Sequence, residues 1–234
     1  MNTLYVIATP IGNLDDITIR AIKTIFSVDI LACEDTRRTG MLLAELRKRH
    51  SSLLTIPDTN PKLMRFDDRG EMNGAIELIT LIEEGKTVGL VSDAGTPLVS
   101  DPGYVLISQC RKRNIRVESI PGASALLAGL TSSGLAADKF TFLGYPPEKE
   151  SHRLKLFTAL TGSNKFIEST YIFYSAPHKL IEMLENMKQT FGDIEVTLAR
   201  ELTKIHEEVS TQRVSALLES SYEPKGEYVV LFRI

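Results

Sequence analysis

The chain of 234 residues has little cysteine and no excess of basic residues. Its two cysteines, Cys33 and Cys110, lie far apart and do not have the spacing of metal ligands, so we expect buried, unpaired thiols in a reducing compartment. A net charge of -3 excludes the bulk basic signature of many nucleic-acid-binding domains. Any contact with RNA must therefore come from local clusters of basic side chains.

We also expect neither a targeting nor a membrane-spanning segment in this sequence. The first eight residues have no basic region and run directly into a strand-like pattern, so we expect no signal peptide. No apolar run approaches the length that spans a bilayer. We therefore expect a cytoplasmic protein without a membrane partner.

What the sequence does contain is the pattern of an α/β protein. Its residues are 43% hydrophobic and 24% charged, which is enough to build a full core. In the first half, short β-prone runs alternate with amphipathic helical runs, which predicts βαβ units and a mostly parallel sheet. In the second half, later strands follow one another closely, which predicts a mixed sheet. We expect two α/β domains, residues 1–118 and 119–234.

The most distinctive segment is Leu90–Gly103, which is built almost entirely from small residues, glycine and proline. It follows an apolar run and precedes a helical one, so it should be a loop at the carboxyl end of a strand. This is the favoured ligand position in an open α/β sheet. Asp101 and Pro102 have the pattern of a helix N-cap and first helical residue. The alternative is an ordinary tight connection, although this loop is longer than most.

Two further loops are expected at the same edge of the sheet. Thr9–Leu14 forms a Gly/Pro turn after the first strand, but it lacks the glycines and lysine of known phosphate-binding loops. Glu34–Arg38 is a mixed-charge cluster at the end of the next strand. Arg37 and Arg38 are candidates for phosphate contacts, whereas the alternative is a set of caps and weak surface ion pairs.

Two segments of the second half have polar or small-residue patterns. Pro121–Ala125 can expose backbone N–H groups at a helix start, or can equally allow close packing. The polar run Ala199–Glu208 follows a buried-looking strand, and Arg200, Glu201 and Lys204 are its candidates for substrate contact. His206 has no second ligand at a metal-binding offset, so we expect no metal site.

The remaining polar segments have weaker patterns. Residues 57–73 predict a long mobile loop or a lid over the substrate, with a disordered insertion as the alternative. Basic runs at 47–50, 111–113 and 152–155 are candidates for RNA contact, or are the ordinary solvated ends of helices.

Taken together, several motifs resemble the tetrapyrrole methylase superfamily and, within it, the bacterial 16S rRNA cytidine ribose 2′-O-methyltransferases. The resemblance extends over nearly the whole chain. The motifs that carry it are Thr9–Leu14, Asp16–Thr18, Cys33–Arg37, Val91–Pro97, Ser100–Gly103, Arg200–Lys204 and His206–Glu208.

The resemblance implies a homodimer in which S-adenosylmethionine binds in a cleft between two α/β domains. The substrate it implies is the 16S rRNA of the small ribosomal subunit, contacted by Arg37, Arg38, Arg200 and Lys204. The residues that it assigns to the cofactor are Pro10, Asp93, Ala94, Gly95, Thr96, Val99, Ser100, Ser124, Ala199 and Gly226.

The expected reaction is a direct displacement in which a ribose hydroxyl attacks the methyl group. A general base would assist, because an alcohol is a poor nucleophile until it loses its proton. The candidates are Glu34, Asp35, Glu201 and Lys204, and the sequence does not rank them. Two alternatives remain at this stage. One is a methyltransferase of the same superfamily acting on a small molecule, and the other is a non-catalytic RNA- or nucleotide-binding protein.

Overall fold

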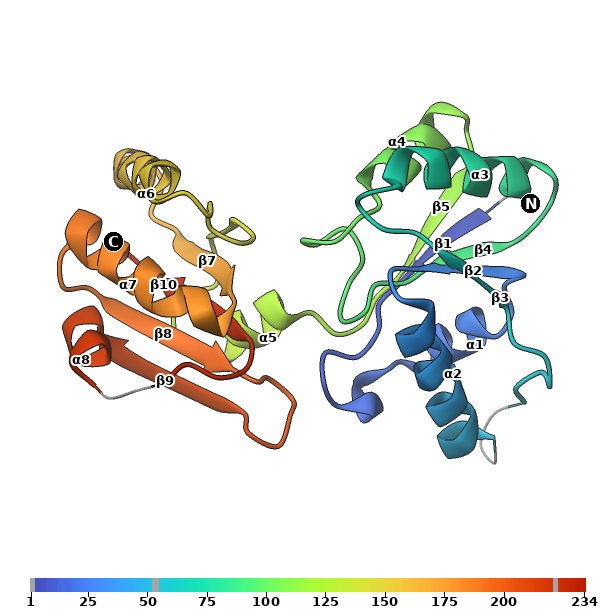
Figure 1. The fold of residues 1–234 in the computed structure, drawn as a ribbon, viewed down its shortest axis with the longest axis horizontal. Helices are drawn as coiled ribbons and strands as arrows, with labels where there is room; N and C mark the ends of the chain where they lie inside the picture. Colours follow the sequence, from blue (N-terminus) through green and yellow to red (C-terminus); the bar gives the residue numbers. More distant parts are fainter. Residues whose placement is uncertain (1–2, 52–54, 221–222) are drawn as a thin grey trace. The chain divides into compact units, whose positions relative to one another are not determined.

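A five-stranded parallel sheet organises the first half of the chain in the computed structural model, which describes residues 3–51, 55–220 and 223–234. The strand order is β3-β2-β4-β1-β5 (Figure 1). The strands are β1 (Thr3–Ile7), β2 (Ile30–Cys33), β3 (Lys62–Arg65), β4 (Val88–Leu90) and β5 (Arg116–Ile120). Every pair is parallel, as the alternating pattern predicts.

Helices cover both faces of this sheet. Alternate residues of β2 divide between two cores, because successive side chains of a strand point to opposite faces. Ile30 and Ala32 pack with α3 (Glu71–Glu83) and α4 (Tyr104–Lys112), whereas Leu31 and Cys33 pack with α1 (Ile19–Ile25) and α2 (Thr36–His50). A short 3₁₀ helix, η1 (Leu14–Asp16), precedes α1. Both cysteines are free and buried in these cores, as expected.

The segment 57–73 is more structured than its composition predicts. It contains the edge strand β3, which pairs with β2 from Ile30↔Lys62 to Cys33↔Arg65, and the first turn of α3. The prediction of one long loop or lid is therefore wrong for residues 62–65 and 71–73. The strand escaped detection because an edge strand with two exposed ends lacks the apolar run of a buried one.

The second half of the chain folds around a mixed sheet in the order β6-β7-β10-β8-β9. Its strands are β6 (Phe140–Phe142), β7 (Thr170–Ser175), β8 (Glu195–Arg200), β9 (Glu208–Arg213) and β10 (Tyr228–Phe232). Only the β6–β7 pair is parallel among the described pairs, and the other three are antiparallel. The predicted combination of a parallel and a mixed sheet is thus confirmed.

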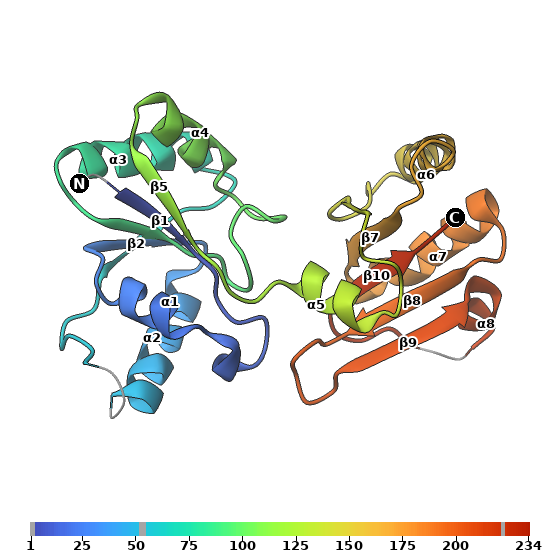
Figure 2. The ribbon, with the colours of Figure 1, turned by 180° about the vertical axis from the view of Figure 1, so that it is seen from behind.

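The central strand β10 separates two packing layers of this second unit. Tyr228, Val230 and Phe232 face a core shared with α6 (Glu150–Asn164), α7 (Pro177–Phe191) and α8 (Val214–Glu219). On the opposite face lies α5 (Ala125–Ser132), as Figure 2 shows. A Cβ at Gly129 of α5 would lie 3.1 Å from Val229, so the glycine permits this close approach.

The division between the two units falls after Ser124, giving Met1–Ser124 and Ala125–Ile234. A boundary after residue 118 would cut through β5, which pairs with β1 as far as Ile120. Each unit has its own sheet and its own buried clusters. No helix in the described part of the chain is both long enough and apolar enough to cross a membrane.

Candidate functional site

Three loops meet at the carboxyl edge of the first sheet. Because β4 lies between β1 and β2, the segments that follow these three strands are neighbours although they are distant in sequence. They are Thr9–Leu14, Glu34–Arg38 and Ser92–Gly103. The predicted meeting of these segments at one edge is confirmed. In open α/β sheets this edge is where ligands bind.

A pair of backbone hydrogen bonds joins the first and third of these loops. The Thr9 N–H donates to the Gly95 carbonyl at 2.8 Å, and the Gly95 N–H donates to the Thr9 carbonyl at 3.1 Å. The buried Thr9 hydroxyl also donates to the Ser92 carbonyl, 3.2 Å away. The expected cofactor residue Pro10 directly follows this clasp and is buried.

Gly95 is required at this clasp for two reasons. Its φ is +83°, a left-handed conformation that favours glycine. A Cβ there would also lie 3.2 Å from Ile11 Cγ2 and 3.8 Å from the Ala123 carbonyl. The Thr96 hydroxyl donates to that same carbonyl at 3.0 Å. The loop is thus held against both the first-strand loop and the turn before Ser124.

The rest of the loop also follows an unusual backbone path. Leu98 and Ser100 have φ values of 72° and 68°, and Gly103 has a φ of 137°. Left-handed non-glycine residues cost free energy and tend to occur where a ligand or a tight turn requires them. Asp93, Ala94 and Ser100 are exposed, while Thr96 and Val99 are half-buried. The loop therefore presents a curved backbone with few bulky side chains, which suits a ligand held by main-chain groups.

For the turn at Pro121–Ala123, the structure favours close packing over exposure of backbone N–H groups to a ligand. A Cβ at Gly122 would approach the Ala8 Cβ to 2.9 Å, and the Ala8 N–H donates to the Ile120 carbonyl at 3.1 Å. Gly122 therefore allows close packing of this turn on the end of β1. The half-buried Ser124 follows it as the last residue of the first unit.

A charged cluster connects the second loop with the third. Glu34 Oε1 accepts from the Asp93 N–H at 3.2 Å, and Arg38 Nη1 lies 3.0 Å from Asp93 Oδ2. Burial raises the pKa of Glu34, against the opposing effect of the hydrogen bond from Asp93. The Arg38 side chain is 68% exposed, so most of it is available to a ligand.

Asp35 serves a different purpose from its neighbour Glu34. Its carboxylate caps α2 by accepting from the Arg37 and Arg38 N–H groups at 2.8 and 3.3 Å. These hydrogen bonds hold the pKa of Asp35 below its usual value. The carboxylate is therefore engaged with the helix start, as the less functional interpretation of this cluster predicts.

Asp101 is a further candidate site residue, which its sequence pattern does not indicate. It was expected to cap the next helix with Pro102 at the first helical position, and this is wrong. The helix α4 begins at Tyr104 and has Gly103 at its N-cap. Glu71 from α3 accepts instead from the Gly103 and Val105 N–H groups, at 2.8 and 3.0 Å.

Asp101 does not cap α4, and its carboxylate is close enough to the Glu34 carboxylate at the sheet edge for the two charges to interact. Burial first, and then the negative charge of Glu34, raise the pKa of Asp101 to about 6, although a hydrogen bond from Ser92 lowers it. Such a pKa near neutrality is typical of functional carboxyl groups. The available signal was its position: Asp101 follows the same small-residue loop that carries the other candidates.

The candidates in the second unit gather around one lysine. Lys204 Nζ lies 2.9 Å from Glu201 Oε1 and 2.8 Å from Glu227 Oε2. Burial lowers the pKa of Lys204, but hydrogen bonds to Glu227 and Glu201 raise it above its usual value overall. Lys204 therefore stays charged at neutral pH, which suits electrostatic stabilisation or positioning better than proton acceptance.

Three more expected site residues lie near this lysine. Gly226 has a φ of 82°, and a Cβ there would come within 2.5 Å of Glu201 Cγ. Ala199 is fully buried in β8, and Arg200 at the end of that strand lies 3.1 Å from Glu208 Oε2. The structure therefore brings Ala199, Arg200, Glu201, Lys204 and Gly226 together within the second unit.

Comparisons with known proteins identify the family of this chain. Residues 3–218 match the family model of the tetrapyrrole (corrin/porphyrin) methylases. A protein of Thermotoga maritima named ribosomal RNA small subunit methyltransferase I is 39% identical over 99% of this chain and 98% of its own length. A protein of the same name from Vibrio cholerae is 40% identical over 97% of this chain and 76% of its own.

Solved structures show the same fold at much lower identity. A diphthine synthase superposes with a TM-score of 0.71 at 15% identity, covering 98% of this chain and 89% of its own. The uroporphyrin-III-C-methyltransferase of Thermus thermophilus has a TM-score of 0.65 at 17% identity, covering 99% and 94%. Both likenesses concern the arrangement of strands and helices alone.

Proposed function

Because this chain belongs to the tetrapyrrole methylase family, and within it to the ribosomal RNA small subunit methyltransferase I group, we propose that it methylates 16S rRNA. The methyl donor is S-adenosylmethionine, and the acceptor is the ribose 2′-hydroxyl of a cytidine. The protein is thus a methyltransferase whose substrate is the RNA of the small ribosomal subunit. It works as a cytoplasmic homodimer.

The observation that carries this proposal is the clasped loop Asp93–Ser100. Gly95 has a left-handed backbone and a tight approach to Ile11, and Thr96 fixes the loop to the turn before Ser124. A curved backbone with exposed small residues fits a donor that is gripped by main-chain groups. In this proposal Pro10, Asp93, Ala94, Gly95, Thr96, Val99, Ser100, Ser124, Ala199 and Gly226 contact the donor.

S-adenosylmethionine supplies an electrophilic methyl group on a positively charged sulfur. The protein contributes chiefly by holding the ribose oxygen in line with that methyl group at near-attack distance. Exclusion of water by the loop would preserve this alignment. The proton of the hydroxyl would then pass to a nearby base as the new oxygen–carbon bond forms and the sulfur–methyl bond breaks, which leaves S-adenosylhomocysteine as the product.

Among the four base candidates, Glu34 has the most suitable surroundings. Asp35 is engaged as the cap of α2, and Lys204 is held in its charged form between two carboxylates. Hydrogen bonds from Glu227 N–H and Lys204 keep the pKa of Glu201 below its usual value, which weakens it as a base. The raised pKa of Glu34 makes it a stronger proton acceptor at the rim of the loop.

The RNA contacts belong to the exposed cations beside these groups. Arg37 is exposed, and Arg38 bridges from α2 to Asp93. Guanidinium groups bind phosphates with paired hydrogen bonds, so both suit the RNA backbone. Arg200 and Lys204 are the corresponding cations of the second unit.

Methyl transfer to isolated small ribosomal subunits tests the proposal. Purified protein, subunits lacking the modification and radiolabelled S-adenosylmethionine are incubated, and ribose methylation is mapped along the 16S rRNA. We expect one 2′-O-methylated cytidine. Binding of the donor by calorimetry without any 2′-O-methyl product would instead favour a small-molecule acceptor. Failure to bind the donor would favour a non-catalytic binding protein.

A further inference from the structure

The loop between β6 and α6, Gly144–Lys149, is unusually well fixed for a surface connection. The Tyr174 N–H donates to the Gly144 carbonyl at 2.9 Å, which ties the start of the loop to β7. Two consecutive prolines, Pro146 and Pro147, then fix φ and reduce the number of conformations available to the backbone. The loop therefore presents its side chains from a nearly constant position.

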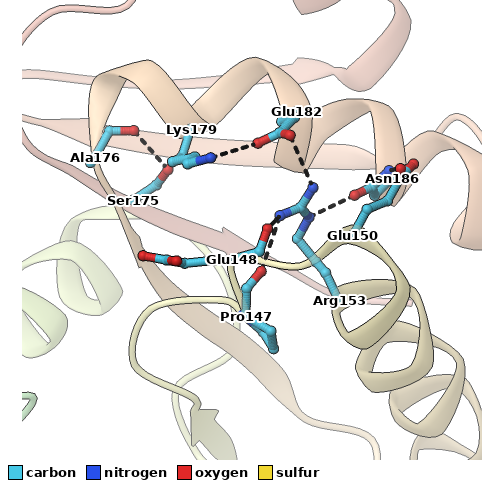
Figure 3. A network of polar contacts seen from close by, with 9 residues as sticks. All are labelled: Pro147, Glu148, Glu150, Arg153, Ser175, Ala176, Lys179, Glu182 and Asn186. Atoms are coloured by element: carbon cyan, nitrogen blue, oxygen red, sulfur yellow. Dashed lines mark hydrogen bonds and ion pairs between the residues drawn. The ribbon is translucent and has the colours of Figure 1, made fainter.

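A buried arginine holds the other end of this loop. Arg153 is 2% exposed, and its Nη1 donates to the Pro147 and Glu148 carbonyls at 3.0 and 3.2 Å (Figure 3). Its Nε donates to Asn186 Oδ1 of α7 at 2.6 Å. This residue belongs to the basic run considered for RNA contact, but it points inward and cannot reach a ligand at the surface.

Burying a charged guanidinium group costs free energy, so the contacts that compensate this cost show what the buried Arg153 side chain stabilises. Removal from water costs several kcal/mol per ion unless hydrogen bonds and opposite charge compensate. The only carboxylate near Arg153 among the described ion pairs is Glu182, at 3.8 Å. Two of its three hydrogen-bonded partners are carbonyl groups of the loop. We conclude that Arg153 is a positioning residue for the segment 144–149.

The side chain that this loop presents is Tyr145. It is 59% exposed, and its ring centroid lies 5.7 Å from that of Tyr174 at an interplanar angle of 65°. Tyr174 in turn packs against Phe142 at 4.8 Å, and its hydroxyl oxygen accepts from the Leu126 N–H at 3.2 Å. Tyr145 is therefore supported by a fixed aromatic pair, while more than half of its surface faces outward.

A single exposed aromatic ring is common on protein surfaces, whereas an exposed ring fixed by packing on two other rings, as Tyr145 is, indicates a binding role. The surrounding charges are mixed, because Glu148 and Glu150 are exposed beside Lys149. Phosphate binding is therefore not favoured here. A fixed, outward-facing ring without a cationic surround suits a flat, uncharged partner. In RNA recognition, unstacked bases commonly rest on such rings.

We propose that Tyr145 is a substrate-binding residue that stacks on a nucleobase of the rRNA substrate, and that Arg153 positions it. This rests on the proposed function, because it requires an RNA substrate. Stacking on a ring already fixed by the protein loses little conformational freedom on binding. The contact would hold an unstacked base of the target region, and the donor-binding loop would be unaffected.

The absence of tryptophan from this chain gives a direct test. Tyr145→Trp introduces a single tryptophan, whose fluorescence a stacked base quenches. On titration with transcribed 16S rRNA, we expect quenching by about half, since base–aromatic stacking brings the rings into contact. The control is Phe166→Trp, because Phe166 is 89% exposed just beyond the end of α6 and away from the proposed contact. No quenching at position 145 on bound RNA, or equal quenching at both positions, would overturn the proposal.

Kinetics separate stacking from donor binding. For Tyr145→Ala we expect the KM for small subunits to rise about tenfold or more, with kcat and donor affinity unchanged, since one stacked base contributes that much. Tyr145→Phe should retain the wild-type KM, because it keeps the ring. A loss of donor affinity in Tyr145→Ala would place the ring at the donor and overturn the proposal. Inactivity of the wild-type protein on subunits would instead refute the proposed function.

The positioning role of Arg153 needs a readout beyond stability. In Tyr145→Trp, adding Arg153→Lys should lower the tryptophan anisotropy, because a lysine lacks the spaced, coplanar Nε and Nη1 donors that hold Asn186 and the two loop carbonyls. The KM for subunits should rise as in Tyr145→Ala, at a temperature where melting curves show the protein folded. Unchanged anisotropy and KM in the folded variant would refute this role.

Discussion

Gly95 has a positive φ, and a Cβ added there would lie close to Ile11. These demands are separable, because Gly85 has a similar φ of 93° but has nothing within 4 Å of an added Cβ. The two glycines therefore differ in surroundings rather than in conformation. This makes one a natural control for the other.

Gly95→Val should abolish tight donor binding. The branched side chain would force the loop away from Ile11 and out of its curved path, and we expect affinity for S-adenosylmethionine to fall by at least about tenfold. Gly85→Val should lose about 1–2 kcal/mol of stability from backbone strain, with unchanged affinity. Calorimetric titration measures both. Equal affinity in the two variants would contradict the assignment of the donor site to this loop.

Asp101 should make the protein less stable as the pH rises. Its folded pKa of about 6 lies above the usual value of 3.8, so folding favours the protonated form. That stability is fully present below pH about 4 and is lost as the pH rises through about 6. Asp101→Asn should therefore gain about 1–2 kcal/mol at pH 8, a value reduced for partial exposure, and change little at pH 4.

Urea unfolding at the two pH values checks this expectation. The control is Asp58→Asn, because Asp58 is an exposed carboxylate outside the cluster. A gain of equal size at pH 4 and pH 8 would show that the effect is not due to ionisation of Asp101.

At the scale of elements, a helix or strand could be predicted from the sequence when its signals are local. It could not when the residues that stabilise it lie elsewhere in the chain. The strand β10 (Tyr228–Phe232) has a strong signal in the sequence itself, because its five consecutive apolar or aromatic residues are all buried. The strand β3 and the start of α4 are missed, because the first is an edge strand and the second is capped by Glu71 from another helix. The same holds for the site, where local motifs predict which loops meet, but not which carboxylate remains available.

The link between α3 and α4 is a testable element. Glu71→Ala removes the acceptor of two N–H groups at the start of α4, and we expect a loss of about 1–2 kcal/mol in the free energy of unfolding, as for a helix cap. The matched control is Glu77→Ala on an exposed face of α3, which should change stability by less than about 0.5 kcal/mol. Urea unfolding compares them, and equal losses would contradict the capping role.

At the scale of the whole molecule, the net charge of -3 means that the RNA is attracted by local cations rather than by the overall field. The exposed arginines Arg37 and Arg38 are the main candidates in the first unit. The basic end of α4 is the alternative there, and Arg113 is already paired with Glu83 at 3.0 Å. Salt dependence distinguishes these two clusters.

RNA binding should therefore depend only modestly on salt. Four cationic contacts to phosphates, from Arg37, Arg38, Arg200 and Lys204, give a slope of about -2.8 in log affinity against log salt, using about -0.7 per contact for a single strand. Arg37→Gln with Arg38→Gln should reduce the slope to about -1.4, measured by filter binding to 16S rRNA. Arg111→Gln should leave it unchanged, and an equal reduction there would assign the contacts to α4 instead.

The clasp between Thr9 and Gly95 also has a consequence for the order in which the protein assembles. Its partners are 86 residues apart, and β4, which carries Gly95 into place, enters the sheet between β1 and β2. The loop proposed to bind the donor can close only after this late strand has docked at the centre of the sheet. A ligand that binds only the native state stabilises it by mass action. In the proposed function the methyl donor therefore selects chains in which β4 has docked between β1 and β2, so that insertion of this central strand and formation of the clasp are the same event.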